Sequence, residues 1–251
     1  MNSKLNGKIN DLVDKYNLNS LDVTSNPREL IIMLLSHIKK TSIANIKLDI
    51  VKVENNDIEA LEDMLNKISN EKIPPQYVTN KEYIWGDNFV VNENVLIPRQ
   101  DTETLIEFAI NTIKEKGYKT ALDMCTGSGI IGILIAKHTE ISKVTLSDIS
   151  TDALQVAREN INISGVDNKC NIIESNMFEA IYKLNNKYDI ILSNPPYLTK
   201  GEMKEISEFV EKEPSIALYG GCDGLDYYRI IYNLLFHLAL KLVLLFLFWE
   251  L

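Results

Sequence analysis

From about residue 101 onward, short apolar runs alternate with longer amphipathic stretches. Apolar runs of strand length lie at residues 120–124, 143–148, 170–174 and 188–193. Stretches with helical spacing lie at residues 102–116, 130–138 and 151–164. Alternation of this kind favours a doubly wound, mostly parallel sheet covered by helices. We therefore predict an α/β fold with a Rossmann-like sheet over residues 101–251.

The first 72 residues show helical spacing without any strand pattern. One helix is predicted to begin near Asn26, with Pro27 in its first turn, and a second near Asn56. Apolar residues recur at spacings of three and four in both stretches, which is typical of a helical bundle. We predict a small helical domain over residues 1–72.

A linker is predicted between these two parts, over residues 73–100. Pro74 and Pro75 end the helical pattern. Residues 83–91 and 95–98 are rich in aromatic and β-branched side chains, which favours a short hairpin.

The charge and cysteine content narrow the class of partner and compartment. The formal net charge is −9, whereas contacts to bare nucleic acid depend on Lys and Arg. A protein or a small molecule is therefore a better candidate partner than nucleic acid.

The three cysteines are scattered without a C-x-x-C pair, so neither a disulfide framework nor a metal site is predicted. No signal peptide follows Met1, and we expect a cytoplasmic protein.

A glycine-rich loop follows the first predicted strand of the sheet. Gly127, Gly129 and Gly132 form G-x-G-x-x-G between a strand and a helix, and Asp148 ends the next strand. This arrangement is typical of a site for an adenosine-containing ligand, whose ribose hydroxyls a carboxylate can hold. A nicotinamide dinucleotide or S-adenosylmethionine fits, the latter with Asp123 near its ammonium. The alternative to a ligand site is that the glycines only allow the strand and the helix to pack closely.

A second motif, Asn194-Pro195-Pro196-Tyr197, directly follows the last predicted strand. It is expected on the same sheet edge as the glycine loop, because ligands bind beyond the carboxyl ends of the strands. The Asn194 side-chain oxygen and the Pro195 carbonyl could accept both N–H bonds of a planar –NH2 group. Such a group needs orientation and charge stabilisation to become a nucleophile. A rigid surface turn is the alternative.

Together these motifs resemble the amino-methyltransferases, which modify nitrogens of adenine, guanine or glutamine. Residues 96–103 resemble a signature of the release factor glutamine methyltransferases. Further similar stretches are residues 75–77 with Gly86, 213–214, 217–218, 220–225 and 228–231. The resemblance covers residues 25–233.

The resemblance implies S-adenosylmethionine as cofactor and methyl transfer to the glutamine of the Gly-Gly-Gln motif in peptide chain release factors. Cofactor contacts are then expected from Cys125, Thr126, Gly127, Ser128, Gly129, Asp148, Met177 and Asn194. Catalytic roles are expected for Asn194, Pro195 and Tyr197. Substrate contacts are expected from Asn194, Pro195, Pro196 and Tyr197. The resemblance also implies that the helical domain binds the release factor and that residues 99, 101 and 103 position the wall of the active site.

The chain departs from the family at three places. Gln100 stands for a proline and Asn176 for an acidic residue. After Tyr232 the family's Gly-Gly turn is absent, and an apolar stretch runs to Leu251. We predict that the last strands are missing or altered after about residue 233, as in a truncated or frame-shifted chain. His237, Lys241 and Glu250 interrupt this stretch, so a membrane span is not expected.

Three other functions remain open at this stage. The target could be a glutamine of a ribosomal protein or a base amino group in nucleic acid. The chain could also be an inactive remnant that binds cofactor without turnover. A dehydrogenase is disfavoured because it leaves Asn194-Pro195-Pro196-Tyr197 unexplained.

Overall fold

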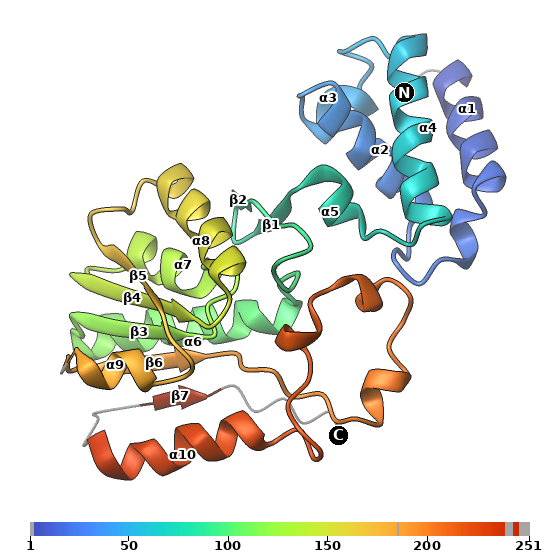
Figure 1. Cartoon of the computed structure of the whole chain (residues 1–251). Helices are drawn as coiled ribbons and strands as arrows, with labels where there is room; N and C mark the ends of the chain where they lie inside the picture. Colours follow the sequence, from blue (N-terminus) through green and yellow to red (C-terminus); the bar gives the residue numbers. More distant parts are fainter. Residues whose placement is uncertain (1–2, 185, 239–242, 246–251) are drawn as a thin grey trace. The chain divides into compact units, whose positions relative to one another are not determined.

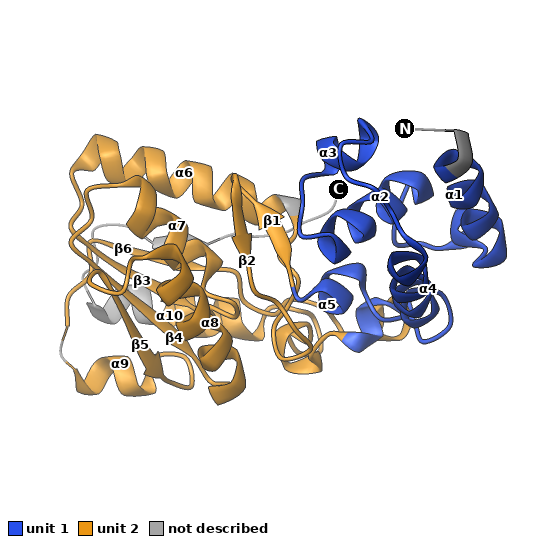
Figure 2. Ribbon diagram, turned by 90° about the horizontal axis from the view of Figure 1, so that it is seen from above, with its two compact units in different colours: residues 1–80, 207–212 blue, residues 81–206, 213–251 orange. Residues whose placement is uncertain are grey.

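The structure, a computed structural model, describes residues 3–184, 186–238 and 243–245. It divides into two compact units, which Figure 2 shows in different colours. The first comprises Met1–Asn80 and Ser207–Lys212, and the second comprises Lys81–Ile206 and Glu213–Leu251. The chain thus passes from one unit to the other three times.

The first unit is helical, as its sequence pattern predicts. Its helices are α1 (Ser3–Lys15), α2 (Pro27–Ile38), α3 (Ile43–Lys47), α4 (Asn55–Ser69) and α5 (Pro75–Thr79). The predicted start of α2 is confirmed, since the Asn26 side chain accepts a hydrogen bond from the Glu29 N–H at 3.2 Å. This cap satisfies an N–H that has no partner within the helix.

The core of the first unit includes a side chain from far along the sequence. Phe209, in the segment Ser207–Lys212, is 7% exposed and belongs to the same apolar cluster as Leu34 of α2 and Leu65 of α4. Nearby, the Lys72 ammonium lies 6.0 Å from the centre of the Phe209 ring. Burial of the aromatic ring holds this returning segment in the helical unit.

The second unit begins with a hairpin of β1 (Glu82–Ile84) and β2 (Asp87–Phe89), which pair antiparallel. The sequence prediction also placed residues 95–98 in the hairpin, and that part is wrong. The Ile97 N–H is used in another way, because it donates to the Glu213 carboxylate at 2.9 Å. Pro98 has no N–H to offer a partner strand.

The main sheet confirms the predicted α/β fold of Rossmann-like type. Five strands lie in the order β5-β4-β3-β6-β7, and every neighbouring pair is parallel. The strands are β3 (Thr120–Met124), β4 (Lys143–Asp148), β5 (Cys170–Glu174), β6 (Ile190–Ser193) and β7 (Val243–Leu245). The helices of this unit are α6 (Gln100–Lys116), α7 (Ile130–His138), α8 (Thr151–Ser164), α9 (Glu179–Lys183) and α10 (Asp226–Leu238).

Helices cover both faces of this sheet (Figure 1). Side chains of α6, α7 and α8 pack with Ala121, Leu146 and Leu192 in one cluster. Side chains of α9 and α10 pack with Leu122 and Ile191 in another. Successive strand residues point to opposite faces, so strands buried on both sides must be apolar at nearly every position. That explains the continuous apolar runs in the sequence.

The strand order creates a switch point in the sheet. From β3 the chain builds β4 and β5 on one side, and β6 is then added on the other side of β3. The last residue of β3, Met124, is the register partner of Ser147 in β4 and of Ser193 in β6. The loops that leave β3, β4 and β6 therefore meet at one edge of the sheet, where open α/β sheets bind ligands.

The predicted alteration after residue 233 falls partly outside the described residues. Within them, α10 continues to Leu238 and β7 pairs in parallel with β6, with Leu192 opposite Leu244. Residues 239–242 and 246–251 are not described. In the described part of the chain, no helix combines the length and the apolar character that a membrane span requires.

Phe209→Ala tests whether the returning segment stabilises the helical unit. Truncating a buried Phe removes apolar contacts and leaves a cavity, so the free energy of unfolding should fall by about 3 kcal/mol. Leu48→Ala is the matched control, because Leu48 is 69% exposed and its loss should cost less than about 0.5 kcal/mol. Urea unfolding measures both. Equal effects of the two changes would contradict the packing role of Phe209.

Candidate active site

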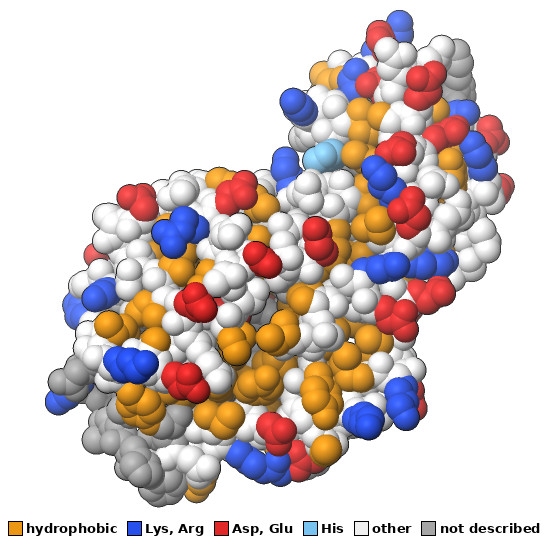
Figure 3. Space-filling view, viewed as in Figure 1, with side chains coloured by type: hydrophobic (Ala, Val, Ile, Leu, Met, Phe, Trp, Pro, Cys, Tyr) orange, Lys and Arg blue, Asp and Glu red, His pale blue; other side chains and the backbone are white. Residues whose placement is uncertain are grey.

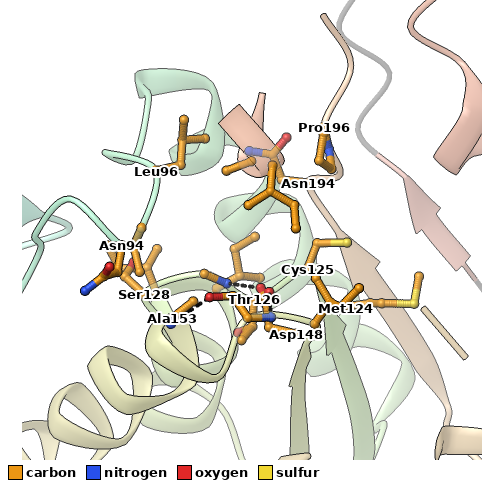
Figure 4. Close-up of a pocket in the computed structure, with 18 of the residues that line it drawn as sticks. Asn94, Leu96, Met124, Cys125, Thr126, Ser128, Asp148, Ala153, Asn194 and Pro196 are labelled. Atoms are coloured by element: carbon orange, nitrogen blue, oxygen red, sulfur yellow. Dashed lines mark hydrogen bonds between the residues drawn. The ribbon is translucent and has the colours of Figure 1, made fainter. Parts of the chain in front are cut away.

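A pocket opens at the edge of the sheet where β3, β4 and β6 end (Figure 4). The empty space in it, open solvent at the mouth included, is about 960 Å³. Ile149 and Ile216 line it and remain 48% and 50% exposed. Figure 3 shows hydrophobic side chains gathered on this side of the second unit. The mouth of the pocket is therefore largely apolar.

The glycine loop between β3 and α7 forms the floor of the pocket. Gly127 has φ of +54° and lines the pocket, and a Cβ added there would meet no protein atom within 4 Å. Packing inside the protein thus does not require this glycine. It leaves room for a ligand to approach the backbone, next to the N-terminus of α7.

The other two glycines of the motif are required by packing. Gly129 has φ of +85° and precedes α7, and its Cβ would lie 3.2 Å from the Ala157 Cβ. At Gly132 an added Cβ would lie 2.9 Å from Leu146 and 3.0 Å from the Asp123 carboxylate. Gly132 therefore lets α7 approach β3 and β4 closely.

Asp148 stands at the end of β4 and fixes the loop. Its Oδ2 accepts a hydrogen bond from the Gly127 N–H at 2.9 Å, and its Oδ1 accepts one from the Ser150 N–H at 3.0 Å. Figure 4 shows this carboxylate beside the loop residues. Each oxygen keeps lone pairs that can accept from the hydroxyl groups of a ribose.

Asp123 lies beneath the loop and is fully buried. Its Oδ2 accepts hydrogen bonds from the Thr126 hydroxyl at 2.5 Å and the Gly132 N–H at 2.9 Å. Its Oδ1 is buried and has no hydrogen-bond partner among the described residues. Burial raises the pKa of Asp123 to about 7, against the opposing effect of the two hydrogen bonds. Asp123 is not among the residues that line the pocket, so it supports the loop from beneath.

Two sulfur-containing residues line the pocket in unusual backbone conformations. Cys125 and Met177 have φ of +57° and +50°, and their sulfur atoms lie 3.9 Å apart. Residues other than glycine adopt such angles rarely, and they often do so at functional sites. Burial raises the pKa of the Cys125 thiol to about 12, so this cysteine stays protonated and serves as a pocket wall.

The turn that follows β6 forms the opposite side of the pocket. Asn194 and Pro196 line it, and the buried Asn194 Oδ1 has no hydrogen-bond partner among the described residues. The turn is held at both ends. The Ser193 hydroxyl donates to the Met124 carbonyl at 2.8 Å, and the Tyr197 N–H donates to the Leu218 carbonyl at 3.2 Å.

The structure gathers most of the predicted site residues in this pocket. Lining residues among them are Cys125, Thr126, Gly127, Ser128, Asp148, Met177, Asn194 and Pro196. Three predicted residues are not among the lining residues: Gly129 precedes α7, Pro195 is buried, and Tyr197 is half-buried beside Leu218.

Other lining residues were not singled out as site residues from the sequence. They include Asn94, Leu96, Pro98, Thr102, Ile149, Ser150, Ile216 and Tyr227. In the sequence, the signature at residues 96–103 was the signal for the pocket wall that includes Leu96, Pro98 and Thr102. Nothing in the pattern of α10 distinguishes Tyr227 from its neighbours. Among the described residues, no group of three or more His, Cys, Asp or Glu side chains could hold a metal ion.

The comparisons with known proteins agree with this geometry. A family model described as the methyltransferase small domain matches residues 100–221. The open space at Gly127 and the carboxylate of Asp148 fit the amino-acid and ribose parts of S-adenosylmethionine. Fold and pocket thus define an S-adenosylmethionine-dependent methyltransferase.

Individual relatives identify the family. Release factor glutamine methyltransferases of Clostridium acetobutylicum and Borreliella burgdorferi are 39% and 43% identical to this chain, over 79% and 80% of its length. The matches span 70% and 68% of those proteins. A ribosomal protein uL3 glutamine methyltransferase of Bordetella pertussis is 33% identical over 67% of this chain and 57% of that protein. The chain belongs to the release factor glutamine methyltransferases.

Asp123→Asn should change how stability depends on pH. The folded-state pKa of about 7 lies above the ordinary value of 3.8, so the folded protein binds this proton more tightly than the unfolded chain. The stabilisation is complete below the ordinary value and is lost as pH rises through about 7, at about 1.4 kcal/mol per unit of pKa difference.

The asparagine variant can keep the hydrogen bonds from Thr126 and Gly132 but does not titrate. Its free energy of unfolding relative to the unchanged protein should therefore rise between pH 5 and pH 8. Urea unfolding of both proteins at the two pH values measures this difference. A difference that is the same at both values would contradict the raised pKa.

Proposed function

We propose that this chain transfers the methyl group of S-adenosylmethionine to the side-chain amide nitrogen of the glutamine in the Gly-Gly-Gln motif of a peptide chain release factor. The observation that carries this proposal is the buried Asn194 Oδ1, which has no hydrogen-bond partner among the described residues and lines the same pocket as the glycine loop. A buried acceptor without a partner is costly unless a ligand supplies the donor.

A glutamine amide is the donor that suits this acceptor. Its nitrogen is a weak nucleophile, because the lone pair is delocalised into the carbonyl. Asn194 Oδ1 accepts one of its N–H bonds and the Pro195 carbonyl accepts the other. These two contacts turn the nitrogen toward the pocket and stabilise the positive charge that develops on it during attack.

The cofactor contributes an electrophilic methyl group on a positively charged sulfur. We assign its contacts to Cys125, Thr126, Gly127, Ser128, Gly129, Asp148 and Asn194, with Met177 beside the adenine. The new bond joins the methyl carbon to the amide nitrogen, and the sulfur keeps the electron pair of the bond that breaks. The nitrogen then loses one proton to water. Pro196 and Tyr197 complete the substrate side of the turn.

Two features favour preorganisation of this turn over an induced fit. The backbone of Tyr197 and Leu198 is hydrogen-bonded to the Leu218 carbonyl at 3.2 and 2.8 Å, and Ser193 is anchored on β3. Fixed acceptors need no reorientation during the reaction, which is how electrostatic preorganisation lowers a barrier.

A protein is the substrate class that the charge favours. The chain carries a formal net charge of −9, and phosphate contacts would require clustered cations. The helical domain predicted over residues 1–72 is proposed to bind the release factor. A glutamine of a ribosomal protein is the second candidate, because the relative from Bordetella pertussis carries that activity in its name.

Radiolabelled methyl transfer tests the proposal. The purified chain is incubated with labelled S-adenosylmethionine and a bacterial release factor, or with the same factor whose Gly-Gly-Gln glutamine is replaced by alanine. Label on the unchanged factor alone is the expected result. Parallel incubations contain ribosomal protein uL3 or DNA in place of the release factor, and label there but not on the release factor would favour the alternative substrate. Cofactor binding without any transfer would identify an inactive remnant.

Asn194→Ala should lower kcat for the release factor by about 10²–10³-fold, the usual effect of removing one preorganised polar contact to the reacting group. Asn162→Ala is the matched control, since Asn162 is exposed on α8. Steady-state methyl transfer measures both variants. An Asn194 variant with unchanged kcat would refute the role of this side chain as acceptor.

A further inference from the structure

A buried carboxylate outside the pocket holds one of its walls. The Glu213 side chain is 2% exposed, and both of its oxygens accept hydrogen bonds. Oε2 accepts from the Ile97 N–H at 2.9 Å, and Oε1 accepts from the Arg99 guanidinium, which is 38% exposed. A buried carboxylate is tolerated only when it is paired and hydrogen-bonded in this way.

The segment fixed by Glu213 is one wall of the pocket. Leu96 and Pro98 flank Ile97 and both line the pocket. Among the strands that the structure describes, none pairs with this segment, so the Ile97 N–H has the Glu213 carboxylate in place of a ladder partner. Arg99 also precedes α6, where its carbonyl accepts from the Thr102 N–H at 2.9 Å. Thr102 lines the pocket as well.

The chain that follows Glu213 reaches the other wall within five residues. Ile216 and Ala217 line the pocket. The Leu218 carbonyl then accepts from the Tyr197 and Leu198 N–H groups, and the Gly220 N–H donates to the Leu198 carbonyl at 2.8 Å. The segment 213–220 therefore connects the wall at Leu96 with the turn that carries Asn194.

Gly220, at the end of this segment, and Gly224, just after it, show how closely the chain packs against the turn. A Cβ at Gly220 would lie 2.6 Å from the Pro196 carbonyl oxygen, and a Cβ at Gly224, where φ is +73°, would overlap the Tyr197 carbonyl oxygen. The backbone of the segment and that of the turn are in direct contact. A displacement of one must move the other, because packed backbones leave no free space between them.

We infer that Glu213 is a positioning residue for methyl transfer, which sets the separation between the Leu96–Pro98 wall and the Asn194 turn. It is not among the residues that line the pocket. Its position in the chain is also notable, since the residue before it, Lys212, belongs to the helical unit. Glu213 is thus the point where the chain re-enters the second unit and is fixed there. The activity readout of this inference rests on the proposed function.

Glu213→Gln is the main test. Both partners of Glu213 are donors, so the amide –NH2 of the variant must face one of them and one contact is lost. We expect kcat for the release factor to fall at least tenfold, while the Kd for S-adenosylmethionine changes less than threefold. The Gly127–Asp148 side of the pocket does not involve Glu213. A lower melting temperature with unchanged kcat would overturn the inference and leave a stabilising role only.

Adding Arg99→Gln to Glu213→Gln should restore part of the lost kcat. In the double variant Glu213→Gln, Arg99→Gln, the amide at position 213 can accept from the Ile97 N–H and donate to the amide at position 99. We expect the double variant to regain at least half of the lost kcat on a logarithmic scale. Lys137→Gln is the matched control, because Lys137 pairs with both oxygens of Asp87 and neither residue lines the pocket. No rescue, or an equal loss in the control, would count against the inference.

A measurement without substrate separates this inference from the proposed function. Hydrogen exchange of the backbone amides reports the two walls directly. In Glu213→Gln the amides of Ile97, Tyr197 and Leu198 should all exchange at least tenfold faster than in the unchanged protein. Faster exchange at Ile97 alone would show that Glu213 acts on one wall only and would overturn the inference. An unchanged protein that fails to label any release factor would instead refute the proposed function.

Discussion

The parallel register of β3 between β4 and β6 is the constraint on which the rest of the site depends. Met124 is opposite Ser147 on one side and Ser193 on the other. This pairing brings the glycine loop, Asp148 and Asn194 to a single edge of the sheet, although they lie up to 70 residues apart. The Ser193 hydroxyl bound to the Met124 carbonyl reinforces the register at the pocket itself. A slip by one residue would turn every side chain to the opposite face.

Three carboxylates around the site illustrate how burial assigns different roles to one functional group. Asp148 holds the glycine loop through one oxygen and accepts from the Ser150 N–H with the other, and Glu213 holds a wall with both oxygens. Asp123 has one oxygen engaged and the other buried without a partner among the described residues. Burial raises the pKa of Asp123, whereas Asp148 lines the pocket and can accept from a ligand.

Two residues that line the pocket, Cys125 and Met177, adopt the left-handed backbone conformation. In the loop, the alternate residues Cys125, Gly127 and Gly129 all have positive φ. Met177, whose sulfur lies near that of Cys125, has positive φ as well. These conformations are stable because β3, β4 and α7 fix both ends of the loop. The Thr126, Gly127 and Gly129 N–H groups are each hydrogen-bonded within the protein. These bonds hold the loop in one conformation, and a preformed loop spares the ligand the cost of ordering it.

The sequence by itself determined the class of fold and the two motifs that identify the family. Continuous apolar runs predict strands buried on both faces, and Gly127 with Asp148 predicts a nucleoside site, because the spacing alone places both at strand ends. Local pattern also fixed the start of α2 at Pro27, where the cap and the proline are neighbours in the chain.

Tertiary structure decided what depends on contacts between distant segments. The run at residues 95–98 has the composition of a strand, yet it forms a pocket wall because the Glu213 carboxylate takes the Ile97 N–H. Phe209 joins the helical core from a stretch with no helical pattern of its own. Tyr227 enters the pocket because α10 packs on the face of the sheet that carries Leu122. A hydrogen bond or contact across more than a hundred residues leaves no periodic trace in a single sequence, so only the folded chain could show these three.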